Sequence, residues 1–222
     1  METKPRVSIL ILTHNAPRYV YRTLKSLRLT GHVSYEVIVV DNHSHFWVKV
    51  LLLWLQQREW VNKLCLLDYN SLFAAGNNIA ALLTDPESPY LLLLNSDVEI
   101  RHPDWLKVLL ENHERGITSY GIVKGNPITR VDGYCLLIDK DLYQKHTLDE
   151  SFQWHWNTTK LQAKILIDGY SVKGFVGHER YIHHFWGKSG NDFKGAKGMD
   201  LDQKEAVSWF QGRSIQVLET PR

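Results

Sequence analysis

Short apolar runs alternate with helical patterns through the first half of the chain. The apolar runs predict buried strands at Val7–Leu12, Tyr35–Val40, Lys63–Leu67 and Tyr90–Leu94. Apolar residues recur at helical spacing after each run, which predicts helices at 15–27, Phe46–Trp60, Gly76–Leu83 and Pro103–Glu114. Strands that alternate with helices through short connections are typical of a parallel sheet with right-handed crossovers. We therefore expect an α/β fold with a mostly parallel central sheet flanked by helices.

The second half of the chain has a less regular pattern. It predicts strands at Tyr134–Ile138 and Tyr170–Val176. Helices are expected in the later part of Asp149–Ile167 and at Asp200–Phe210. Between them, the segment Lys188–Gly198 is rich in Gly and Lys and is expected to be a mobile loop. No stretch reads as a linker that would divide the chain, so we expect a single domain.

Polar and acidic residues follow each of the first four predicted strands. They are Thr13 and Asn15, then Asp41, then Asp68 and Asn70, then Asn95 and Asp97. Because the carboxyl ends of parallel strands meet at one edge of a sheet, where ligands bind, these side chains are expected to converge. A carboxylate such as Asp97 beside a second oxygen ligand suits a divalent cation that bridges phosphates. The alternative is an ordinary loop acid or helix cap.

Composition narrows the class of protein only moderately. The 222 residues are 44% hydrophobic and 23% charged, with a net charge of +2, which fits a globular protein and gives no reason to expect a nucleic acid partner. Cys65 and Cys135 lie in apolar runs and read as reduced core residues. With neither a signal segment nor a membrane-spanning segment apparent, we expect a soluble cytoplasmic protein, and peripheral membrane contact stays open.

The segment from Asn70 to Asn78 is a further candidate for ligand binding. Gly76 would let the backbone approach a ligand, and Asn77 offers donors and acceptors where a helix is predicted to begin. An ordinary Asn-capped helix explains the same residues. The sequence lacks the G-x-x-x-x-G-K-[ST] and G-x-G-x-x-G patterns, so a P-loop ATPase and a Rossmann dehydrogenase both lack their fingerprint.

Five segments together resemble a known family. VSILILTHNAPRYVYRTLKSL, YEVIVVDNHS, the Asn70–Asn78 segment, YLLLLNSD and DGYCLLI have the order and spacing of a family-2 glycosyltransferase with the GT-A fold. The resemblance covers roughly residues 6–190. Within the family, the Asn-x-Asp form of the Asp-x-Asp motif resembles the rhamnosyltransferase-like branch, and transferase domains that glycosylate viral capsids are also similar.

The resemblance implies an organisation and an activity. Residues 1–190 would form the GT-A catalytic domain, with a nucleotide-binding half at 1–100 and an acceptor-side half at 101–190, and residues 191–222 would add a Gly/Lys-rich loop and a C-terminal helix. Such an enzyme transfers a hexose or deoxyhexose from a UDP-sugar, or a dTDP-sugar, to a hydroxyl of a glycan or glycoprotein acceptor, with inversion. Its cofactor would be Mn²⁺ or Mg²⁺. The chain would also suit one part of a longer multidomain enzyme.

The resemblance also implies roles for single residues on the donor side. Thr13 and Asn15 would flank the nucleoside, and Asp41 would hydrogen-bond the base or ribose. Gly76 and Asn77 would lie under the nucleotide. Asp97 would bind the metal with Asn95 beside it. A late family histidine, five residues before a serine, matches His184 and Ser189, with His183 adjacent, although a surface or core imidazole explains either histidine equally well.

The sequence departs from the family where the general base is expected. The acidic signature that resembles D-E-R-F-F-x-x-W-E-D-x-D reads DESFQWHWNTTK at 149–160, so the Glu-Asp pair becomes Asn157-Thr158. Neither an amide nor a hydroxyl takes the acceptor proton at neutral pH. His155, Asp132 and Asp149 are the candidate substitutes. For each, a structural role in a turn, a cap or the core is an equal alternative.

Two other functions remain open. The lost Glu-Asp pair would also suit a nucleotide-sugar-binding module whose transferase activity has decayed. A nucleotidyltransferase would normally carry a Gly-rich Arg/Lys loop after the first strand, and residues 13–18 contain no Gly.

Overall fold

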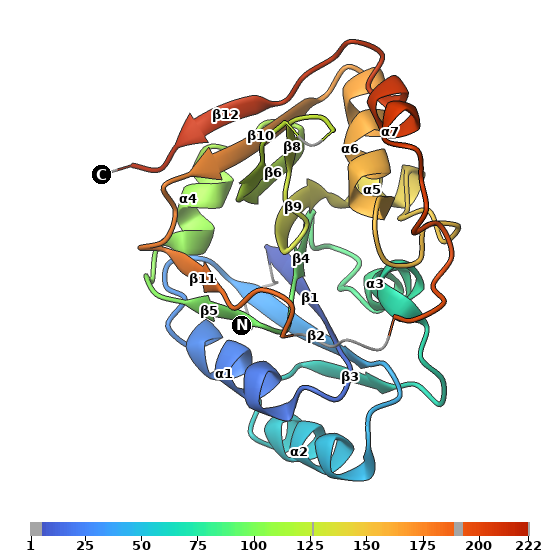
Figure 1. Ribbon diagram of the computed structural model, residues 1–222. Helices are drawn as coiled ribbons and strands as arrows, with labels where there is room; N and C mark the ends of the chain where they lie inside the picture. The colour runs from blue at the N-terminus through green and yellow to red at the C-terminus, as the bar shows by residue number, and fades with distance from the viewer. Residues whose placement is uncertain (1–5, 126, 189–192, 222) are drawn as a thin grey trace.

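The computed structural model describes residues 6–125, 127–188 and 193–221, which form one large sheet covered by helices on both faces (Figure 1). The strands of the first half are β1 (Val7–Thr13), β2 (Tyr35–Asp41), β3 (Lys63–Leu66), β4 (Tyr90–Leu94) and β5 (Val98–Ile100). Those of the second half are β6 (Gly116–Tyr120), β7 (Ile122–Val123), β8 (Arg130–Val131), β9 (Cys135–Asp139), β10 (Ser171–Val176), β11 (Ile182–His184) and β12 (Gln216–Glu219). The helices are α1 (Pro17–Leu27), α2 (Phe46–Gln57), α3 (Leu72–Leu82), α4 (Trp105–Glu111), α5 (Lys140–Lys145), α6 (Asn157–Ile167) and α7 (Gln203–Trp209).

The large sheet has the strand order β12-β10-β6-β9-β4-β1-β2-β3. Strand β1 lies between β2 and β4 and runs parallel to both, and β2 runs parallel to β3. Strand β9 is antiparallel to both neighbours, β4 and β6. The expectation of an α/β fold with a mostly parallel sheet is confirmed.

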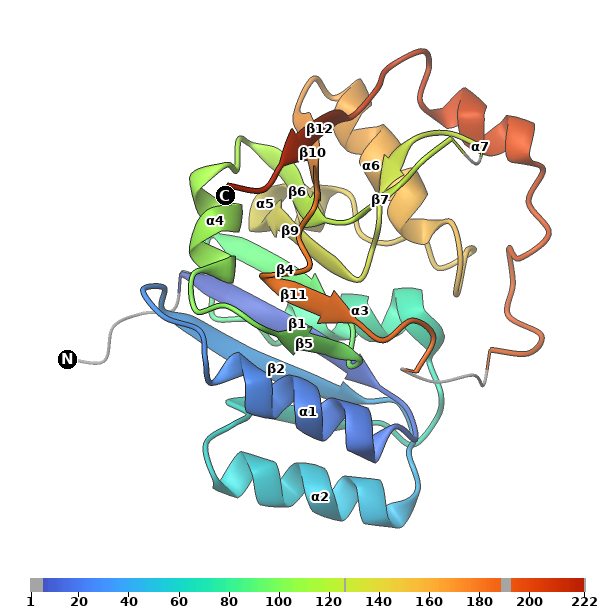
Figure 2. The ribbon, with the colours of Figure 1, turned by 60° about the vertical axis from the view of Figure 1, so that its left-hand side comes forward.

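Alternation of side chains along the strands builds a separate core on each face of the sheet. In β1, Ile9 and Ile11 belong to one hydrophobic cluster and Leu10 to the other. The first cluster includes buried residues of α1, α2 and α4, and the second includes those of α3 and α6. Figure 2 shows α1 and α2 side by side beneath the strands that they cover. Continuous apolar runs such as Tyr90–Leu94 are therefore buried on both sides.

The sequence pattern did not predict several strands, most of them in the second half of the chain. Strand β6 (GITSY) is fully buried although two of its residues are polar. Strands β5 and β11 form a small antiparallel sheet, and β7 pairs with β8. Strand β12 pairs with β10 in the large sheet, so residues 191–222 supply a strand as well as the expected helix.

The predicted helix boundaries differ from those of the structure by up to four residues, and the largest difference is at the start of α3. Helix α3 begins at Leu72, not at Gly76. A Cβ at Gly76 would lie 2.4 Å from Leu12 Cδ1, so glycine here allows the helix to pack closely against β1. Of the expected mobile loop at Lys188–Gly198, residues 189–192 lie outside the described part of the chain.

Candidate active site

The carboxyl ends of β1, β2 and β4 carry the polar residues expected there. Thr13 and Asp41 are register partners at the ends of β1 and β2. Asp41 is completely buried and its Oδ2 accepts a hydrogen bond from Ser44 N at 3.1 Å. Its Oδ1 and the hydroxyl of Thr13 are buried without a partner in the described structure. A buried carboxylate oxygen without a donor is costly, so this corner suits a ligand that brings a hydrogen-bond donor.

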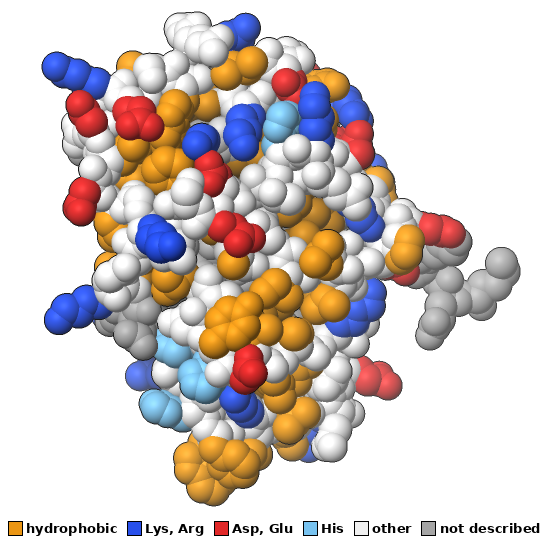
Figure 3. All heavy atoms as spheres, turned by 90° about the vertical axis from the view of Figure 1, so that its right-hand side faces the viewer, with side chains coloured by type: hydrophobic (Ala, Val, Ile, Leu, Met, Phe, Trp, Pro, Cys, Tyr) orange, Lys and Arg blue, Asp and Glu red, His pale blue; other side chains and the backbone are white. Residues whose placement is uncertain are grey.

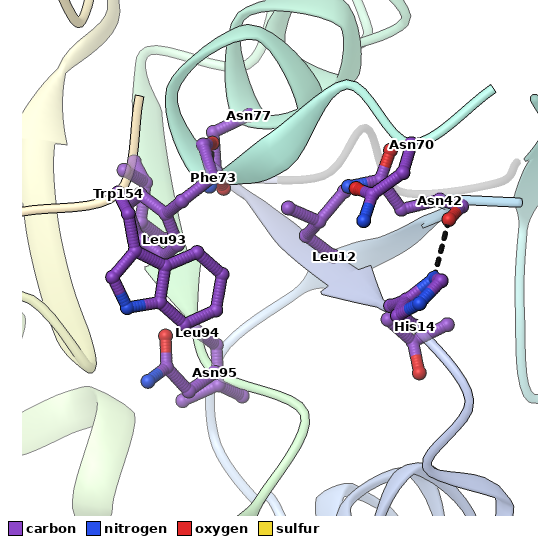
Figure 4. Close-up of a pocket in the computed structure, with 11 residues that line it drawn as sticks. Leu12, His14, Asn42, Asn70, Phe73, Asn77, Leu93, Leu94, Asn95 and Trp154 are labelled. Atoms are coloured by element: carbon purple, nitrogen blue, oxygen red, sulfur yellow. Dashed lines mark hydrogen bonds between the residues drawn. The ribbon is translucent and has the colours of Figure 1, made fainter. Parts of the chain in front are cut away.

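A pocket opens at this edge, which we call the edge pocket (Figure 4). Its polar lining comes from Thr13, His14, Asn42, Asn70, Asn77 and Asn95. Its apolar lining comes from Leu12, Phe73, Leu93, Leu94 and Trp154. A small polar set within an apolar, partly aromatic wall is typical of a site for a planar organic ligand.

A second, larger pocket adjoins it, which we call the aromatic pocket. Its rings come from Phe73, Tyr134, Trp154, His155, Trp156, His184 and Trp186. Its polar groups include Asn95, Arg130, Asp132, Asn157 and Thr158. Phe73, Asn95 and Trp154 line both pockets. Aromatic faces interleaved with hydrogen-bonding groups suit a sugar ring, which has apolar faces and polar edges.

Asp97 lies just beyond β4 and meets a residue far away in the sequence. Its carboxylate is completely buried, and its Oδ1 lies 3.2 Å from His184 Nε2. Its Oδ2 accepts a hydrogen bond from Lys188 N at 2.8 Å. The Nδ1 of His184 is buried without a partner in the described structure, and the imidazole stacks on Tyr134 with ring centroids 4.3 Å apart.

The structure separates the two adjacent histidines. His183 and His184 are consecutive in β11, so their side chains point to opposite faces of the strand. His184 lines the aromatic pocket, whereas the His183 ring packs edge-on against Phe185 at 4.7 Å. Burial, with Arg101 nearby, lowers the pKa of His183. His183 therefore lies away from the pockets and His184 beside one, and the metal-binding role of each stays a prediction. Ser189, the other half of that family spacing, lies outside the described residues.

The donor set around Asp97 fits a cation only in part. No group of three or more His, Cys, Asp or Glu side chains in the described part of the chain is arranged to hold a metal ion. A carboxylate and an imidazole nevertheless meet at Asp97 and His184. Mg²⁺ and similar ions often take only one or two protein ligands when substrate phosphates supply the others. The arrangement suits a cation that binds together with a diphosphate.

The three candidate bases differ in their surroundings. Asp149 forms an ion pair with Lys160 at 2.6 Å and lies outside the linings of both pockets. Burial would raise the pKa of Asp149, but hydrogen bonds from Lys160 and Ser151 outweigh it and lower the pKa to about 2. So weak a base is a poor proton acceptor, and this ion pair accounts for Asp149 structurally.

Asp132 and His155 both line the aromatic pocket. Burial raises the pKa of the Asp132 carboxyl, although His184 and backbone donors at Gly133 and Tyr134 partly oppose the rise. Burial and the charge of Arg130 lower the pKa of His155. A raised carboxyl pKa moves Asp132 toward the range of a general base near neutral pH.

Asn157, which stands where the family has an acid, has a structural role. It is 1% exposed, and its amide nitrogen donates to the carbonyl oxygens of Phe152 at 2.8 Å and Trp154 at 3.0 Å. A carboxylate in this position would face two carbonyl acceptors. The amide holds the turn that places Trp154 and Trp156 around the aromatic pocket.

The remaining predicted donor-side residues divide into two groups. Thr13, Asn77 and Asn95 line the edge pocket. Asn15 lies outside its lining and ties β1 to α2, since its Oδ1 accepts from His45 N at 2.8 Å. Gly76 also lies outside the lining and packs against Leu12, while Asp41 lies at the end of the neighbouring strand. Their roles toward a ligand stay predictions.

Several lining residues were not among the predicted site residues. His14 and Asn42 flank predicted ones in the sequence, and the position of each directly after a strand was the available signal. Arg130 reaches the aromatic pocket from a segment with no motif of its own, whereas Tyr134 and Trp186 lie in segments that resemble the family but were not singled out there. Only the fold brings them together.

Sequence comparison identifies the family to which these segments are similar. The family model described as "Glycosyl transferase family 2" matches residues 8–186. No curated protein sequence matches the chain.

Solved structures add a likeness in fold. S. aureus TarS 1–349 matches with a TM-score of 0.58 and 17% identity over 72% of this chain and 55% of that chain. The same fragment in complex with UDP-GlcNAc matches with a TM-score of 0.55 and 18% identity over 71% and 53%. Mannosyltransferase PcManGT from Pyrobaculum calidifontis, in complex with GDP-Man and Mn²⁺, matches with a TM-score of 0.61 and 17% identity over 76% and 54%. The chain spans about half the length of these structures, and the likeness confirms the predicted GT-A fold.

Proposed function

Because the chain belongs to glycosyl transferase family 2, we propose that it transfers a sugar from a nucleoside diphosphate donor to an acceptor hydroxyl, with inversion. The observation that carries the proposal is that two pockets share the wall formed by Phe73, Asn95 and Trp154. Group transfer needs donor and acceptor groups that are held next to each other. We assign the edge pocket to the nucleotide and the aromatic pocket to the sugar and acceptor.

The nucleotide assignment draws on the hydrogen-bonding groups at the sheet edge. The unpartnered Oδ1 of Asp41 would accept a hydrogen bond from a base N–H or a ribose hydroxyl, and Thr13 beside it would bond the same nucleoside. Phe73 and Trp154 supply apolar walls. UDP-linked sugars are our first choice of donor, because a similar solved structure is a complex with UDP-GlcNAc. Sugars linked to dTDP, such as rhamnose, are the second choice, because the Asn-x-Asp motif resembles that of the rhamnosyltransferase-like branch.

The diphosphate would lie between Asn95 and Asp97 at the end of β4. Asp97 and His184 would hold Mn²⁺ or Mg²⁺ there, with the donor phosphates completing its ligands. Such an ion supplies positive charge that stabilises the leaving diphosphate. Asp97 is held rigidly for this role by its contacts to His184 and Lys188 N.

Acceptor activation is assigned to Asp132 in preference to His155 or Asp149. The carboxylate of Asp132 would take the proton of the acceptor hydroxyl. In the same step, the oxygen of that hydroxyl would form a bond to the anomeric carbon. The bond from that carbon to the diphosphate oxygen breaks in the same step, and the electron pair leaves with the diphosphate. The tryptophans around the pocket would stack on the sugar rings of a glycan or glycoprotein acceptor.

The first test separates the donor site from the base. Calorimetry should show UDP binding that depends on Mn²⁺ in the wild type, and Asp97→Asn should weaken it by about tenfold or more, because the cation loses a charged ligand. Asp132→Asn should keep UDP affinity and lower the transfer rate, and the acceptor-independent donor hydrolysis, by roughly 10²–10⁴-fold. Asp149→Asn is the matched control and should retain the rate.

Each outcome decides one assignment. Unchanged Mn²⁺-dependent binding in Asp97→Asn would remove Asp97 from the metal site. A normal rate in Asp132→Asn with a large loss in His155→Gln would move the base to His155. A wild-type protein that binds UDP with Mn²⁺ but neither transfers nor hydrolyses any nucleotide-sugar would be the decayed binding module, an alternative that the replacement of the family acids by Asn157 and Thr158 keeps in view.

A further inference from the structure

Helix α2 exposes an apolar face to solvent. Five large hydrophobic side chains on it are exposed, namely Phe46 (69%), Trp47 (78%), Val50 (40%), Leu53 (45%) and Trp54 (40%). We call these five residues the α2 face. They recur at a spacing of three to four residues, so they form one stripe along the helix. Figure 3 shows exposed hydrophobic side chains at the lower end of the molecule, where α2 lies, with histidines beside them.

Packing against the sheet does not require the α2 face. The other side of the helix presents Val48, Leu52 and Leu55, which are 5%, 0% and 0% exposed and belong to the core under β1 and β2. A helix that is apolar on both sides is normally buried on both sides. Monomeric proteins seldom leave a contiguous apolar stripe in water, so such a stripe marks a binding surface.

Cationic side chains border the α2 face. The Arg58 guanidinium lies 4.4 Å from the Trp54 ring centroid, and Arg28 lies 5.1 Å from that of Trp60, whose ring is 6.4 Å from Trp54. Lys49 is on α2 itself and Lys25 is exposed on α1. Helix α1 lies beside α2 in both ribbon views (Figures 1 and 2).

The same segment has few acidic residues, and those are buried. Between residues 14 and 58 the sequence has two acids, Glu36 and Asp41, and they are only 6% and 0% exposed. Glu36 is paired with Lys63 at 3.0 Å. Two acids outside this segment offset part of the positive charge. Glu99 forms an ion pair with Arg22, and Glu59, which directly follows Arg58, is exposed. The two-helix surface therefore has an excess of positive charge, although the whole chain has a net charge of only +2.

We propose that the α2 face docks the protein onto an anionic lipid bilayer, with its aromatic side chains in the headgroup region and the surrounding Arg and Lys residues against lipid phosphates. Exposed Trp and Phe on a helix with basic flanks match the chemistry of an interfacial amphipathic helix. A second copy of the chain is the poorer occupant, because a two-fold contact would bring two positively charged surfaces together.

The position of the α2 face fits this role. The turn before α2 is bound to the carboxyl end of β1, since Asn15 N donates to Ser44 Oγ at 2.8 Å and His45 N donates to Asn15 Oδ1 at 2.8 Å. Docking through α2 would therefore hold the edge of the sheet that carries the pockets close to the lipid surface. No helix among the described residues is long and apolar enough to cross a membrane, so contact of this kind is peripheral.

Vesicle sedimentation tests the proposal with the whole chain. The protein should bind vesicles of equimolar phosphatidylcholine and phosphatidylglycerol about tenfold more tightly than vesicles of phosphatidylcholine alone, and added salt should weaken the binding. The double variant Phe46→Ser, Trp47→Ser should lose about tenfold or more in affinity. Leu82→Ser, at an 85% exposed position on α3, is the matched control and should bind normally.

A second pair of variants tests the charges. Lys25→Gln with Arg28→Gln should reduce binding to the anionic vesicles by several-fold, whereas Lys204→Gln with Arg213→Gln, both exposed on the far part of the chain, should not. UDP binding should be normal in all of these variants, so failure here is distinct from failure of the proposed transferase function. Equal binding to both vesicle types, or normal binding by the Phe46/Trp47 variant, would overturn the proposal. The proposal would also be overturned if sedimentation velocity showed that the wild type is a dimer and that the Phe46/Trp47 variant is a monomer.

Discussion

Replacing Asn157 by Asp would restore a family-like acid and should nevertheless destabilise the protein. The side-chain amide is 1% exposed and donates to two carbonyl oxygens, those of Phe152 and Trp154. The substitution removes both donors and points a carboxylate oxygen at two acceptors. Loss of two hydrogen bonds with the acceptors left buried costs roughly 2–5 kcal/mol of unfolding free energy. At about 2–4 °C per kcal/mol for a chain of this size, the melting temperature should fall by about 5 °C or more.

The pH dependence of this variant carries a second signature. Burial raises the pKa of the introduced carboxyl group, because the charged form is poorly solvated there. The loss of stability relative to wild type should therefore be smallest near pH 4, where the group is protonated, and should grow as pH rises to 7. Differential scanning fluorimetry of both proteins from pH 4 to pH 8 measures this difference in melting temperature.

The matched control is Asn62→Asp. There the amide oxygen accepts from Val37 N at 2.8 Å, a role that a carboxylate keeps, so the same chemical change should shift the melting temperature little. An Asn157→Asp variant as stable as wild type at every pH would refute the donor role of the amide. Faster sugar transfer in that variant would refute the assignment of the base to Asp132.

Two further variants test packing and charge. Gly76→Ala places a Cβ 2.4 Å from Leu12 Cδ1, so we expect overpacking to cost roughly 1–3 kcal/mol in chemical denaturation, whereas Gly31→Ala, with its nearest contact at 3.6 Å, should be tolerated. Lys160→Met removes the partner of Asp149, whose depressed pKa of about 2 gives stability that is present above about pH 4 and is lost as pH falls toward 2. The variant should lose less stability than wild type over that acid range, and an identical acid profile would show that the ion pair contributes nothing.

The strands around the site could be predicted because burial on both faces leaves a continuous apolar run. Tyr90–Leu94 is such a run, and the polar residues that follow it are where the parallel sheet requires them. Strand β6 escaped prediction because its polar residues are buried through hydrogen bonds instead of being replaced by apolar ones. Ser119 Oγ, for example, lies 2.8 Å from the carbonyl oxygens of both Asp132 and Cys135 and donates its single proton to one of these acceptors. Only the folded chain supplies such partners.

Site residues could be predicted from the sequence only where a family motif lies at the end of a predicted strand. Asp97 lies three residues beyond the end of β4, but its contact with His184 joins residues 87 positions apart. The pattern predicts the start of α3 at Gly76, four residues too late, because it does not show that this glycine is needed inside the helix for contact with Leu12. The sequence could not predict the hydrogen-bond acceptors of the Asn157 amide, because they are backbone carbonyl oxygens of the preceding turn.

The lining residues that the two pockets share, Phe73, Asn95 and Trp154, have a thermodynamic consequence. A ligand that moved the Trp154 indole in one pocket would change the shape of the other pocket, and the two ligands would then alter each other's affinity. Reciprocity then requires that each alters the dissociation constant of its neighbour by the same factor. The affinity of one pocket for its ligand would therefore depend on which ligand occupies the other pocket, even with no change in the residues that contact the first ligand.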